Sequence, residues 1–397
     1  MQIQTGSAAN GVLAKTSQTE IAGKCVLHVV TTLRSGGAER MLTRIVTWNE
    51  TSKVGAGGDR LRHVVVTLTD GGVHAETLCA AGVPVHTLSM RTSAPAAAAG
   101  LFRLIALMRR YKPRMVMSWL YHADLLATLA APFAGNPPLV WNIRCSSLDL
   151  DNHPRSTRYI VRALARLSRR PCAVAANSTR GRKVHQALGY RPRRWTLLPN
   201  GFEPDVWRPD EDDRQRMRAA LGYGDDDIVA VLVARLDPEK DHQTFLAAAL
   251  RAARACDNLR FLLIGKGTET LPVEPALQDK LMAMGERSDV EVILRACDLS
   301  VLSSRSEGFP NVVGEAMATG LPCVVTDVGD AAAIVGDTGL ICPSHDPEAM
   351  ADALLLMVAG GPEHLRRRGK MARDRIVNRY SLEAAVAAYR SLWLETP

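Results

Sequence analysis

Short apolar runs of strand length alternate along the chain with longer segments of helical periodicity. In the first half, the helical segments are Glu39–Trp48, Gly100–Tyr111 and Ala123–Phe133. The runs predicted to form strands are Lys24–Thr31, His63–Leu68, Pro84–Leu88, Arg114–Leu120, Leu139–Ile143, Cys172–Ala176 and Trp195–Pro199. Because strands that alternate with helices favour crossover connections, this half predicts a parallel sheet covered by helices on both faces.

The same alternation resumes after an interruption. Asn200-Gly201 is a turn signal, and the polar, acidic stretch 203–227 predicts a linker. Beyond it, the predicted elements are strands Ile228–Ala234, Arg260–Ile264, Leu299–Leu302 and Cys323–Thr326, and helices Gln243–Ala255 and Asn311–Thr319. We therefore expect two doubly wound, Rossmann-like α/β domains that face each other across a cleft. Ligands of such folds bind beyond the carboxyl ends of the strands.

The expected organisation has five parts, which differ in composition and periodicity. They are a flexible tail at 1–23, a first domain at 24–202, the linker at 203–227, a second domain at 228–380, and a C-terminal helix at 381–397 that packs back towards the first domain.

Composition narrows the class of protein. The chain has 397 residues, 47% hydrophobic and 23% charged, which is ordinary for a globular protein and excludes disordered and collagen-like chains. No apolar run approaches the ~18 residues of a spanning helix, and the first twenty residues lack the apolar core of a signal peptide. The eight cysteines form no C-x-x-C pair, which is typical of reduced thiols. We expect a cytoplasmic protein.

Charge is distributed unequally between the halves. Residues 1–200 carry 27 basic and 9 acidic residues, and residues 201–397 carry 22 and 32. Six arginines repeat at helical spacing on one segment that contains no acid: Arg155, Arg158, Arg162, Arg166, Arg169 and Arg170. This pattern predicts contact with an anionic membrane, although a solvated helix face is the simpler alternative. Nucleic acid is not expected as a partner, since aromatic residues are only 5% and no recognised nucleic-acid module is present.

The segment 303–322 carries the most informative chemistry. A strand is followed by a loop with Glu307, then by a helix that Asn311 is expected to cap and that Gly320 ends. Glu315 falls early in this helix. Two carboxylates and a helix N-terminus suited to a phosphate are therefore predicted at the carboxyl edge of the second sheet.

This segment resembles the signature of the retaining family-4 glycosyltransferases of the GT-B fold, in which two glutamates are separated by seven residues. Further matches follow in the family's order over roughly residues 24–385. They are the glycine loop Ser35–Arg40, the interdomain boundary Leu198–Gly201, the phosphate clamp Ala234–Leu236 with Lys240, and the runs Arg287–Val290 and Ala296–Leu299.

The resemblance implies a role for each matching residue. Glu315 would accept the ribose hydroxyls, Glu307 would face the donor sugar, and Arg235 and Lys240 would neutralise the diphosphate as the leaving group develops charge. His122, after a strand of the first domain, would face the reacting sugar, with Asp124 and His153 as weaker alternatives. Donor-binding backbone is expected at Gly36, Gly37, Phe309, Pro310, Asn311 and Val312.

The implied function is transfer of a sugar, with retention, from a UDP- or GDP-sugar to a hydroxyl of a glycan or polyprenyl-diphosphate-linked glycan at the inner face of the cell membrane. No cofactor and no metal are expected. Asp149–Asp151 and Asp225–Asp227 spell the D-x-D of a metal-dependent fold, but three residues are a weak pattern. Two alternatives stay open: a nucleotide-sugar epimerase of the same fold, and a basic module that binds nucleic acid or membrane.

Overall fold

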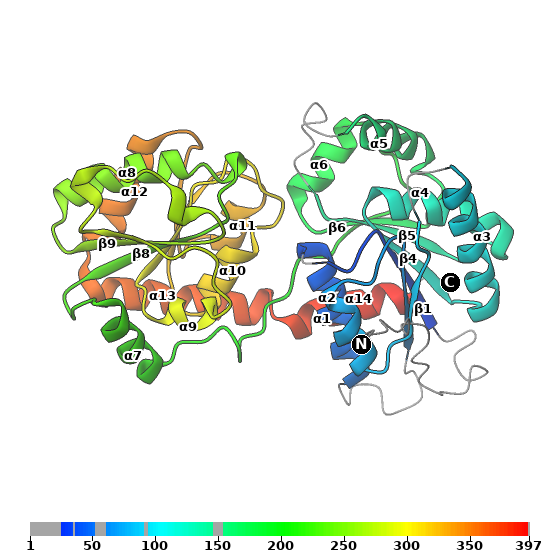
Figure 1. Ribbon diagram of the computed structural model, residues 1–397, viewed down its shortest axis with the longest axis horizontal. Coiled ribbons are helices and arrows are strands. Elements are labelled where there is room, and N and C mark those ends of the chain that lie inside the picture. The colour runs from blue at the N-terminus through cyan, green and yellow to red at the C-terminus, as the bar shows by residue number, and fades with distance from the viewer. Residues whose placement is uncertain (1–24, 35, 52–60, 91–93, 146–153, 396–397) are drawn as a thin grey trace, which may run out of the picture. The chain divides into compact units, whose positions relative to one another are not determined.

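A computed structural model describes residues 25–34, 36–51, 61–90, 94–145 and 154–395. They form two parallel sheets with helices packed around each (Figure 1). We call the seven-stranded sheet with its helices the first lobe and the six-stranded sheet with its helices the second lobe. The predicted fold class, two Rossmann-like α/β domains, is confirmed. The tail expected at 1–23 lies outside the described residues.

The first sheet has the strand order β3-β2-β1-β4-β5-β6-β7. Its strands are β1 (Cys25–Val30), β2 (Arg62–Thr67), β3 (Val85–Thr87), β4 (Met115–Trp119), β5 (Leu139–Ile143), β6 (Ala173–Ala176) and β7 (Trp195–Leu197). β1 is central and pairs in parallel with β2 and β4. All six of its residues are buried, as expected for a strand covered on both faces.

Two helices of the first lobe, Val73–Ala80 and Thr179–Ala187, were not predicted, and one predicted helix is divided in two. The helices are α1 (Gly37–Thr51), α2 (Val73–Ala80), α3 (Ala94–Tyr111), α4 (Tyr121–Ala130), the 3-10 helix η2 (Ala131–Ala134), α5 (Arg155–Leu167) and α6 (Thr179–Ala187). The single helix expected at Ala123–Phe133 is thus divided. Pro132 lies at the start of η2 and cannot donate the bond that would continue α4.

The last helix, α14 (Leu382–Glu395), ends against the first sheet. The Trp393 ring lies edge-on to the buried imidazoles of His28 and His63, with centroids 5.8 and 4.7 Å away. Its indole nitrogen points to the sulfur of Met117 at 3.5 Å. Arg114 donates to the carbonyls of Trp393 and Leu394, which satisfies the end of the helix.

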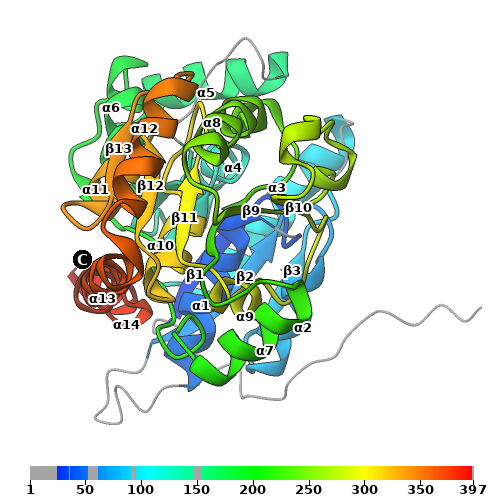
Figure 2. The same cartoon turned by 90° about the vertical axis from the view of Figure 1, so that its left-hand side faces the viewer.

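The second sheet has the order β10-β9-β8-β11-β12-β13, and Figure 2 shows this lobe from its own side. Its strands are β8 (Ile228–Val233), β9 (Leu259–Ile264), β10 (Leu281–Ala283), β11 (Leu299–Leu302), β12 (Cys323–Thr326) and β13 (Leu340–Cys342). The sequence pattern did not predict β10 and β13, which are three-residue edge strands and too short for a recognisable apolar run.

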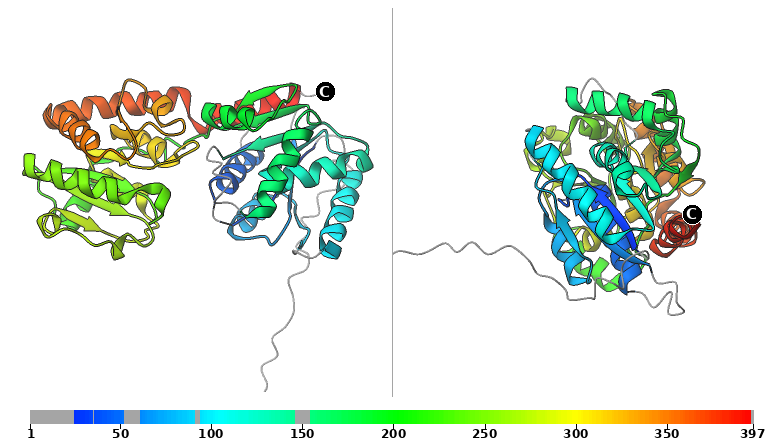
Figure 3. Two further views of the ribbon diagram at one scale, coloured as in Figure 1. Left: turned by 90° about the horizontal axis from the view of Figure 1, so that it is seen from above. Right: turned by 90° about the vertical axis from the view of Figure 1, so that its right-hand side faces the viewer.

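Helices cover both faces of the second sheet. They are α7 (Glu211–Leu221), η4 (Pro238–Lys240), α8 (His242–Ala255), η5 (Thr268–Thr270), η6 (Pro275–Leu277), α9 (Val290–Arg295), α10 (Asn311–Ala318), α11 (Ala331–Val335), α12 (Pro347–Val358) and α13 (Gly361–Arg379). One apolar core lies under α8 and α12, and the other under α9, α10, α11 and α13. Figure 3 shows α13 as one long helix.

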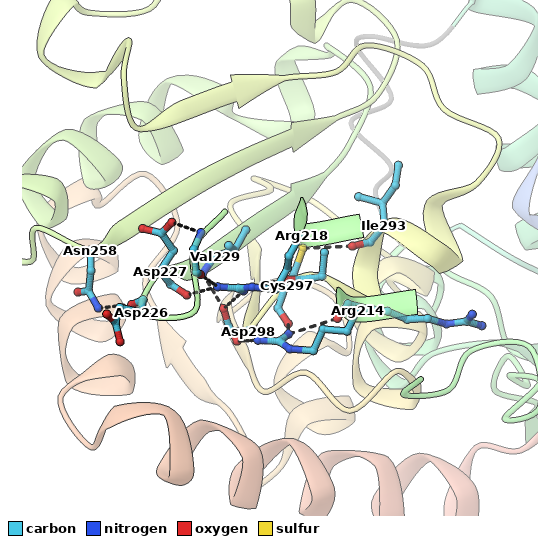
Figure 4. Close-up of polar contacts among 12 residues, drawn as sticks. Arg214, Arg218, Asp226, Asp227, Val229, Asn258, Ile293, Cys297 and Asp298 are labelled. Atoms are coloured by element: carbon cyan, nitrogen blue, oxygen red, sulfur yellow. Dashed lines mark hydrogen bonds and ion pairs between the residues drawn. The ribbon is translucent and has the colours of Figure 1, made fainter. Parts of the chain in front are cut away.

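The stretch 203–227, predicted as a linker, folds in part into α7. Asp210 caps this helix by accepting the Asp213 amide, and Gly222 ends it in the left-handed conformation. Arg214 and Arg218 both reach Asp298, at 2.6 and 3.2 Å, before strand β11 (Figure 4). Asp298 also accepts the amide of Val229 at 2.8 Å, so α7 is fixed to the second sheet.

Candidate functional site

Two loops at the carboxyl edge of the second sheet are joined by one charged pair. Nζ of Lys240 lies 2.5 Å from Oε1 of Glu307, and the side chains are 23% and 12% exposed. The hydroxyl of Ser304 donates to the same oxygen at 2.8 Å. The structure thus brings together two residues that the sequence predicted for the site, with the charges of the pair compensated before any ligand binds.

Lys240 is positioned by the short helix that carries it. After β8, Asp237 caps η4 by accepting the Glu239 amide, and Lys240 is the last residue of that helix. Its carbonyl accepts the hydroxyl of Ser303 at 2.7 Å. The Glu239 carbonyl accepts the Arg305 amide at 2.7 Å. The loops after β8 and β11 are therefore connected by backbone as well as side-chain bonds.

Arg235, which was predicted to neutralise the donor diphosphate, pairs within its own loop. Its side chain is 67% exposed and its guanidinium lies 2.7 Å from the carboxylate of Asp237. Burial acts to raise the pKa of Asp237, but bonds from the Glu239 amide and Arg235 outweigh it, and the pKa is lowered. A phosphate that recruits Arg235 must compete with this ionised carboxylate.

A second ion pair beside the site was missed from the sequence. Asp241, whose side chain is 1% exposed, pairs with Arg305 at 3.0 Å and caps α8 by accepting the Thr244 amide. Burial opposes ionisation of Asp241, but these bonds prevail and lower its pKa. Asp237, Asp241 and Arg305 line a cavity of about 350 Å³. The signal available was an aspartate immediately before a helical segment.

Helix α10 presents the second glutamate of the motif. Glu315 lies in this helix and is 6% exposed. The predicted cap was wrong by one position, because Pro310 is the capping residue and Asn311 is the first helical residue. The side chain of Asn311 instead accepts a bond from Asn200 at 2.5 Å. The Val313 amide donates to the Pro310 carbonyl at 3.3 Å, whereas the amides of Asn311 and Val312 come before any carbonyl of the helix that could accept them.

Phe309 contributes to the core rather than offering its ring to a ligand. The ring is buried and packs near Phe202 and Tyr380, with centroids 6.2 and 5.8 Å away. Only the backbone of this residue is thus available for donor contact, as the sequence-based role required.

A glycine allows a third loop to approach Glu307. Gly329 has φ +59°, and a Cβ atom there would lie 2.5 Å from the Glu307 carbonyl oxygen. The next residue, Asp330, donates its amide to the Gly308 carbonyl at 3.0 Å. The loop after β12 therefore supports the backbone that carries Glu307.

In the first lobe, the glycine loop leads directly into α1. Helix α1 begins at Gly37, and Glu39 in its first turn is 7% exposed. A Cβ atom at Gly36 would lie 2.2 Å from the Glu39 carboxylate, which is the flexible end of that side chain and could move aside. Burial raises the pKa of Glu39. A buried acidic side chain thus lies in the first turn of α1, next to the backbone of Gly36 and Gly37 that was predicted to bind the donor.

His122 lies at the carboxyl edge of the first sheet, as predicted. It is the second residue of α4, is exposed, and has a pKa lowered by partial desolvation. Asp124, a weaker candidate, is instead buried and accepts the Ser118 hydroxyl at 2.6 Å; burial raises its pKa well above the usual range. The other weaker candidate, His153, lies outside the described residues.

The basic segment forms α5, which ends earlier than its arginine pattern suggests. Arg169 and Arg170 lie beyond the last helical residue, Leu167. Val161 and Leu164 are buried. The arginines Arg155, Arg162, Arg166, Arg169 and Arg170 are exposed, and Arg158 is half-buried. Tyr159 is 68% exposed on the same helix.

Within the described ranges, no group of three or more His, Cys, Asp or Glu side chains is arranged to hold a metal ion. Asp149–Asp151 lies outside the described residues. Asp227, in the other D-x-D, pairs with Arg260 at 3.0 Å and accepts the Gly224 amide, so it stabilises a turn. None of the described helices is both long and apolar enough to cross a bilayer.

Comparison with known proteins assigns both lobes to one family. The model for group 1 glycosyl transferases matches residues 227–360, and the model for glycosyltransferase family 4 matches residues 56–206. Together the two models match more than half of the chain.

Two curated relatives illustrate the range of the family. The N-acetyl-alpha-D-glucosaminyl L-malate synthase of Bacillus anthracis is 25% identical over 46% of this chain and 49% of its own length. The UDP-Gal:alpha-D-GlcNAc-diphosphoundecaprenol alpha-1,3-galactosyltransferase of Escherichia coli is 23% identical over 74% of this chain and 79% of its own. Apart from the latter, the chain spans about half the length of the curated relatives that it matches.

Solved structures agree in fold. The Anabaena protein HepE, solved in complex with UDP, has a TM-score of 0.78 at 20% identity, covering 92% of this chain and 98% of its own. Sucrose-phosphate synthase from Thermosynechococcus elongatus has a TM-score of 0.72 at 17% identity, covering 94% and 98%. With two Rossmann-like lobes and both family models matched in order, the chain belongs to the group 1, family 4 glycosyltransferases of the GT-B fold.

Proposed function

We propose that the chain is a retaining glycosyltransferase that moves a sugar from a nucleotide-diphosphate sugar to a hydroxyl of a glycan or lipid-linked glycan. The observation that carries this proposal is the arrangement at the carboxyl edge of the second sheet. There Lys240 pairs with Glu307 in the loop before α10, and Glu315 is buried in α10 itself. A cation, a sugar-facing carboxylate and a ribose-binding carboxylate are what a nucleotide-sugar donor requires.

The donor diphosphate would bind at the Lys240 end of this arrangement. An ammonium group near the leaving phosphate stabilises the charge that develops when the glycosidic bond breaks. Amides of the first turn of α10 would add donors to a phosphate. Arg235 would join after leaving Asp237. UDP is favoured over GDP, since HepE was solved with UDP and the Escherichia coli relative is named for UDP-Gal.

Retention would follow from attack on the same face from which the diphosphate leaves. Glu307 is poorly suited as a covalent nucleophile, because its Oε1 already accepts bonds from Lys240 and Ser304. A phosphate oxygen of the leaving group would then take the acceptor proton. His122, exposed at the edge of the first sheet and with a lowered pKa, would orient the sugar as a neutral imidazole.

The acceptor would be a lipid-linked glycan at the cytoplasmic face of the membrane. The Escherichia coli relative is named for a diphosphoundecaprenol acceptor. In this chain, α5 and the residues after it present five exposed arginines beside the exposed ring of Tyr159. Near an anionic leaflet, each basic residue contributes about 1 kcal/mol of attraction.

Donor binding is tested by the thermal stability of the full chain with UDP, GDP, ADP or CMP. A nucleotide at one hundred times its dissociation constant stabilises the folded state by about 2.7 kcal/mol. We expect UDP to do so, and Glu315→Ala to abolish the effect. Glu348→Ala is the matched control, because that glutamate is 78% exposed on α12. Failure of every nucleotide to stabilise the wild type would contradict the donor assignment.

Transfer is tested separately, with a UDP-sugar and a lipid-diphosphate-linked monosaccharide. Formation of a disaccharide with an unchanged anomeric configuration is expected. Conversion of the donor alone into an isomeric UDP-sugar would instead identify an epimerase.

Membrane contact is tested by sedimentation with vesicles containing 30 mol% phosphatidylglycerol at about 0.15 M salt, where only close contacts escape screening. Replacing Arg162, Arg166 and Arg169 by Gln should release the protein. Replacing the exposed Arg251 and Arg254 of α8 by Gln is the control and should not. Equal binding of both variants would overturn the patch assignment.

A further inference from the structure

A second cavity lies at the opposite edge of the second sheet from Glu307. Cys297 and Asp298, which line it, immediately precede β11, whereas the Glu307 loop follows that strand. The cavity measures about 260 Å³ and is bounded by the start of α7, the turn before β11, the turn after α10 and the outer face of α13. Figure 4 shows Arg214, Cys297 and Asp298 from this region. No residue assigned to donor binding lines it.

Helix α13 presents a row of cations to the cavity. Arg366, Lys370 and Arg373 line it and follow one another by four and three residues, so they lie on one face of the helix. None of the three pairs with a carboxylate among the ion pairs of the described residues. Their charges are therefore not compensated by the protein's own acids at contact distance.

The carboxylates of the cavity are already engaged. Asp298 accepts bonds from Arg214, Arg218 and the Val229 amide. Asp210 caps α7 through the Asp213 amide at 3.1 Å. Three acids line the cavity, and Glu211 is the one that forms no ion pair within the described residues. Its carboxylate accepts only a long hydrogen bond, at 3.5 Å, from the side chain of Gln215. The lining as a whole is positive.

The guanidinium of Arg373 is held in a fixed position by backbone groups of the fold, unlike a side chain that lies free on the surface. This guanidinium donates to the carbonyls of Trp207 at 2.8 Å and Pro204 at 3.0 Å, and also to that of Ala318. Burial lowers the pKa of Arg373, with nearby Arg208 acting in the same sense and Asp205 and Asp374 opposing. A desolvated cation held only by carbonyls is stabilised further when an anion binds next to it.

We infer that this cavity between α7 and α13 binds the phosphate group of a small phosphorylated compound, at a site separate from the donor nucleotide. Arg366 and Lys370 contact the phosphate, and Arg373 provides fixed positive charge behind it. The volume exceeds what one orthophosphate needs and lies just below the ~300–1,000 Å³ of typical small-molecule pockets. The ligand class that fits is a phosphate monoester of sugar size.

The test is calorimetric titration of the full chain with orthophosphate and with glucose 6-phosphate, in phosphate-free buffer. Three variants are compared with the wild type. Arg366→Ala combined with Lys370→Ala removes the exposed cations of the cavity. Arg367→Ala is the matched control, since this exposed neighbour on α13 does not line the cavity. Arg235→Ala combined with Lys240→Ala removes the cations of the proposed donor site.

We expect glucose 6-phosphate to bind at least tenfold more weakly to the Arg366/Lys370 variant and unchanged to the other two. Tighter binding of glucose 6-phosphate than of orthophosphate would identify a monoester, and equal binding would identify free phosphate as the ligand. The inference is overturned if neither probe binds at 5 mM, or if binding is lost only in the Arg235/Lys240 variant. Loss of binding only in the Arg235/Lys240 variant would still support the proposed donor site. Failure of this inference can therefore be distinguished from failure of the proposed function.

Discussion

The ammonium group of Lys240 and the carboxylate of Glu307 form one compact unit, with Nζ 2.5 Å from Oε1, although 67 positions separate them in the chain. Each belongs to a loop that follows a different strand, β8 or β11, and these strands are neighbours in the second sheet. Their carboxyl ends therefore meet at one edge. The pair orients Lys240 in advance, which lowers the ordering cost of bringing a cation to a phosphate.

The first prediction concerns this pair. Lys240→Ala should lower kcat/KM for sugar transfer by at least about 100-fold, equivalent to ~2.7 kcal/mol of lost transition-state stabilisation, because the developing charge on the diphosphate loses a cation. The measurement is steady-state transfer from a UDP-sugar. Arg251→Ala, an exposed position in the C-terminal half of α8, is the control and should stay within threefold of wild type. If Lys240→Ala also stays within threefold of wild type, Lys240 does not stabilise the transition state of transfer.

The second prediction separates backbone strain from crowding at two glycines. Gly222 has φ +75°, and no atom lies within 4 Å of the position that a Cβ would take, so Gly222→Ala should cost only the ~1–2 kcal/mol of a left-handed residue. Gly329 has a similar φ, but a Cβ there would meet the Glu307 carbonyl oxygen at 2.5 Å. Gly329→Ala should cost about 1–3 kcal/mol more and should also impair transfer, because the Glu307 loop must shift. Urea unfolding and transfer assays check both effects; equal costs would refute the close approach.

Sequence patterns predict the bounds of a strand best where the whole strand is buried. The central strands, such as β5 (Leu139–Ile143) and β11 (Leu299–Leu302), were predicted with their bounds because a buried parallel strand is a continuous apolar run. The edge strand β13 was missed because its apolar run, Leu340–Cys342, is only three residues long. Helix α7 was missed because its acidic first turn resembled linker composition, although aspartates at that position favour a helix.

The site was predictable in part for a similar reason. Glu307 and Glu315 are close in sequence, and their place after a strand was sufficient to locate them at one edge. The partner that Arg235 selects could not be predicted, because several acids follow it in the chain and only the geometry of the fold selects Asp237. The cations of α13 were also missed, since their importance depends on which acids contact them.

The third prediction concerns Asp298, which holds α7 to the second sheet. Its partners Arg214 and Arg218 are 21% and 8% exposed. Asp298→Ala should therefore lower the free energy of unfolding by about 3–5 kcal/mol, because two largely buried guanidinium groups and the Val229 amide lose their acceptor. The measurement is urea unfolding of the wild type and the variant.

A matched control for Asp298 is available nearby. Asp289 pairs with Arg287 at 2.7 Å, but these side chains are 37% and 40% exposed. Asp289→Ala should cost no more than about 1 kcal/mol, since solvent screens the pair. If both variants unfold at the same urea concentration, the cluster of Asp298 with the two arginines does not stabilise the lobe.

The fourth prediction is a loss of stability in mild acid. His28 is fully buried, accepts the Trp119 indole N–H at 3.2 Å and lies 3.0 Å from His63; burial and the neighbouring His63 lower its pKa well below the usual range. His185 in α6 is also buried, which lowers its pKa to about 4 despite its bond to the Gly181 carbonyl. Below pH ~6.5 the unfolded chain binds protons at these positions while the folded chain does not.

These two histidines therefore add no pH dependence to stability above neutral pH, and each lowers the stability by about 1.4 kcal/mol for every pH unit below ~6.5. For His185 the decline should end near pH 4, where the folded state also takes up the proton. The measurement is the free energy of unfolding between pH 5.5 and 8, above the range in which most carboxylates titrate. His185→Gln should reduce the slope below pH 6 by about 1.4 kcal/mol per unit, whatever its effect at pH 8. A slope that is the same in His185→Gln and the wild type would contradict the neutral, buried state of this ring.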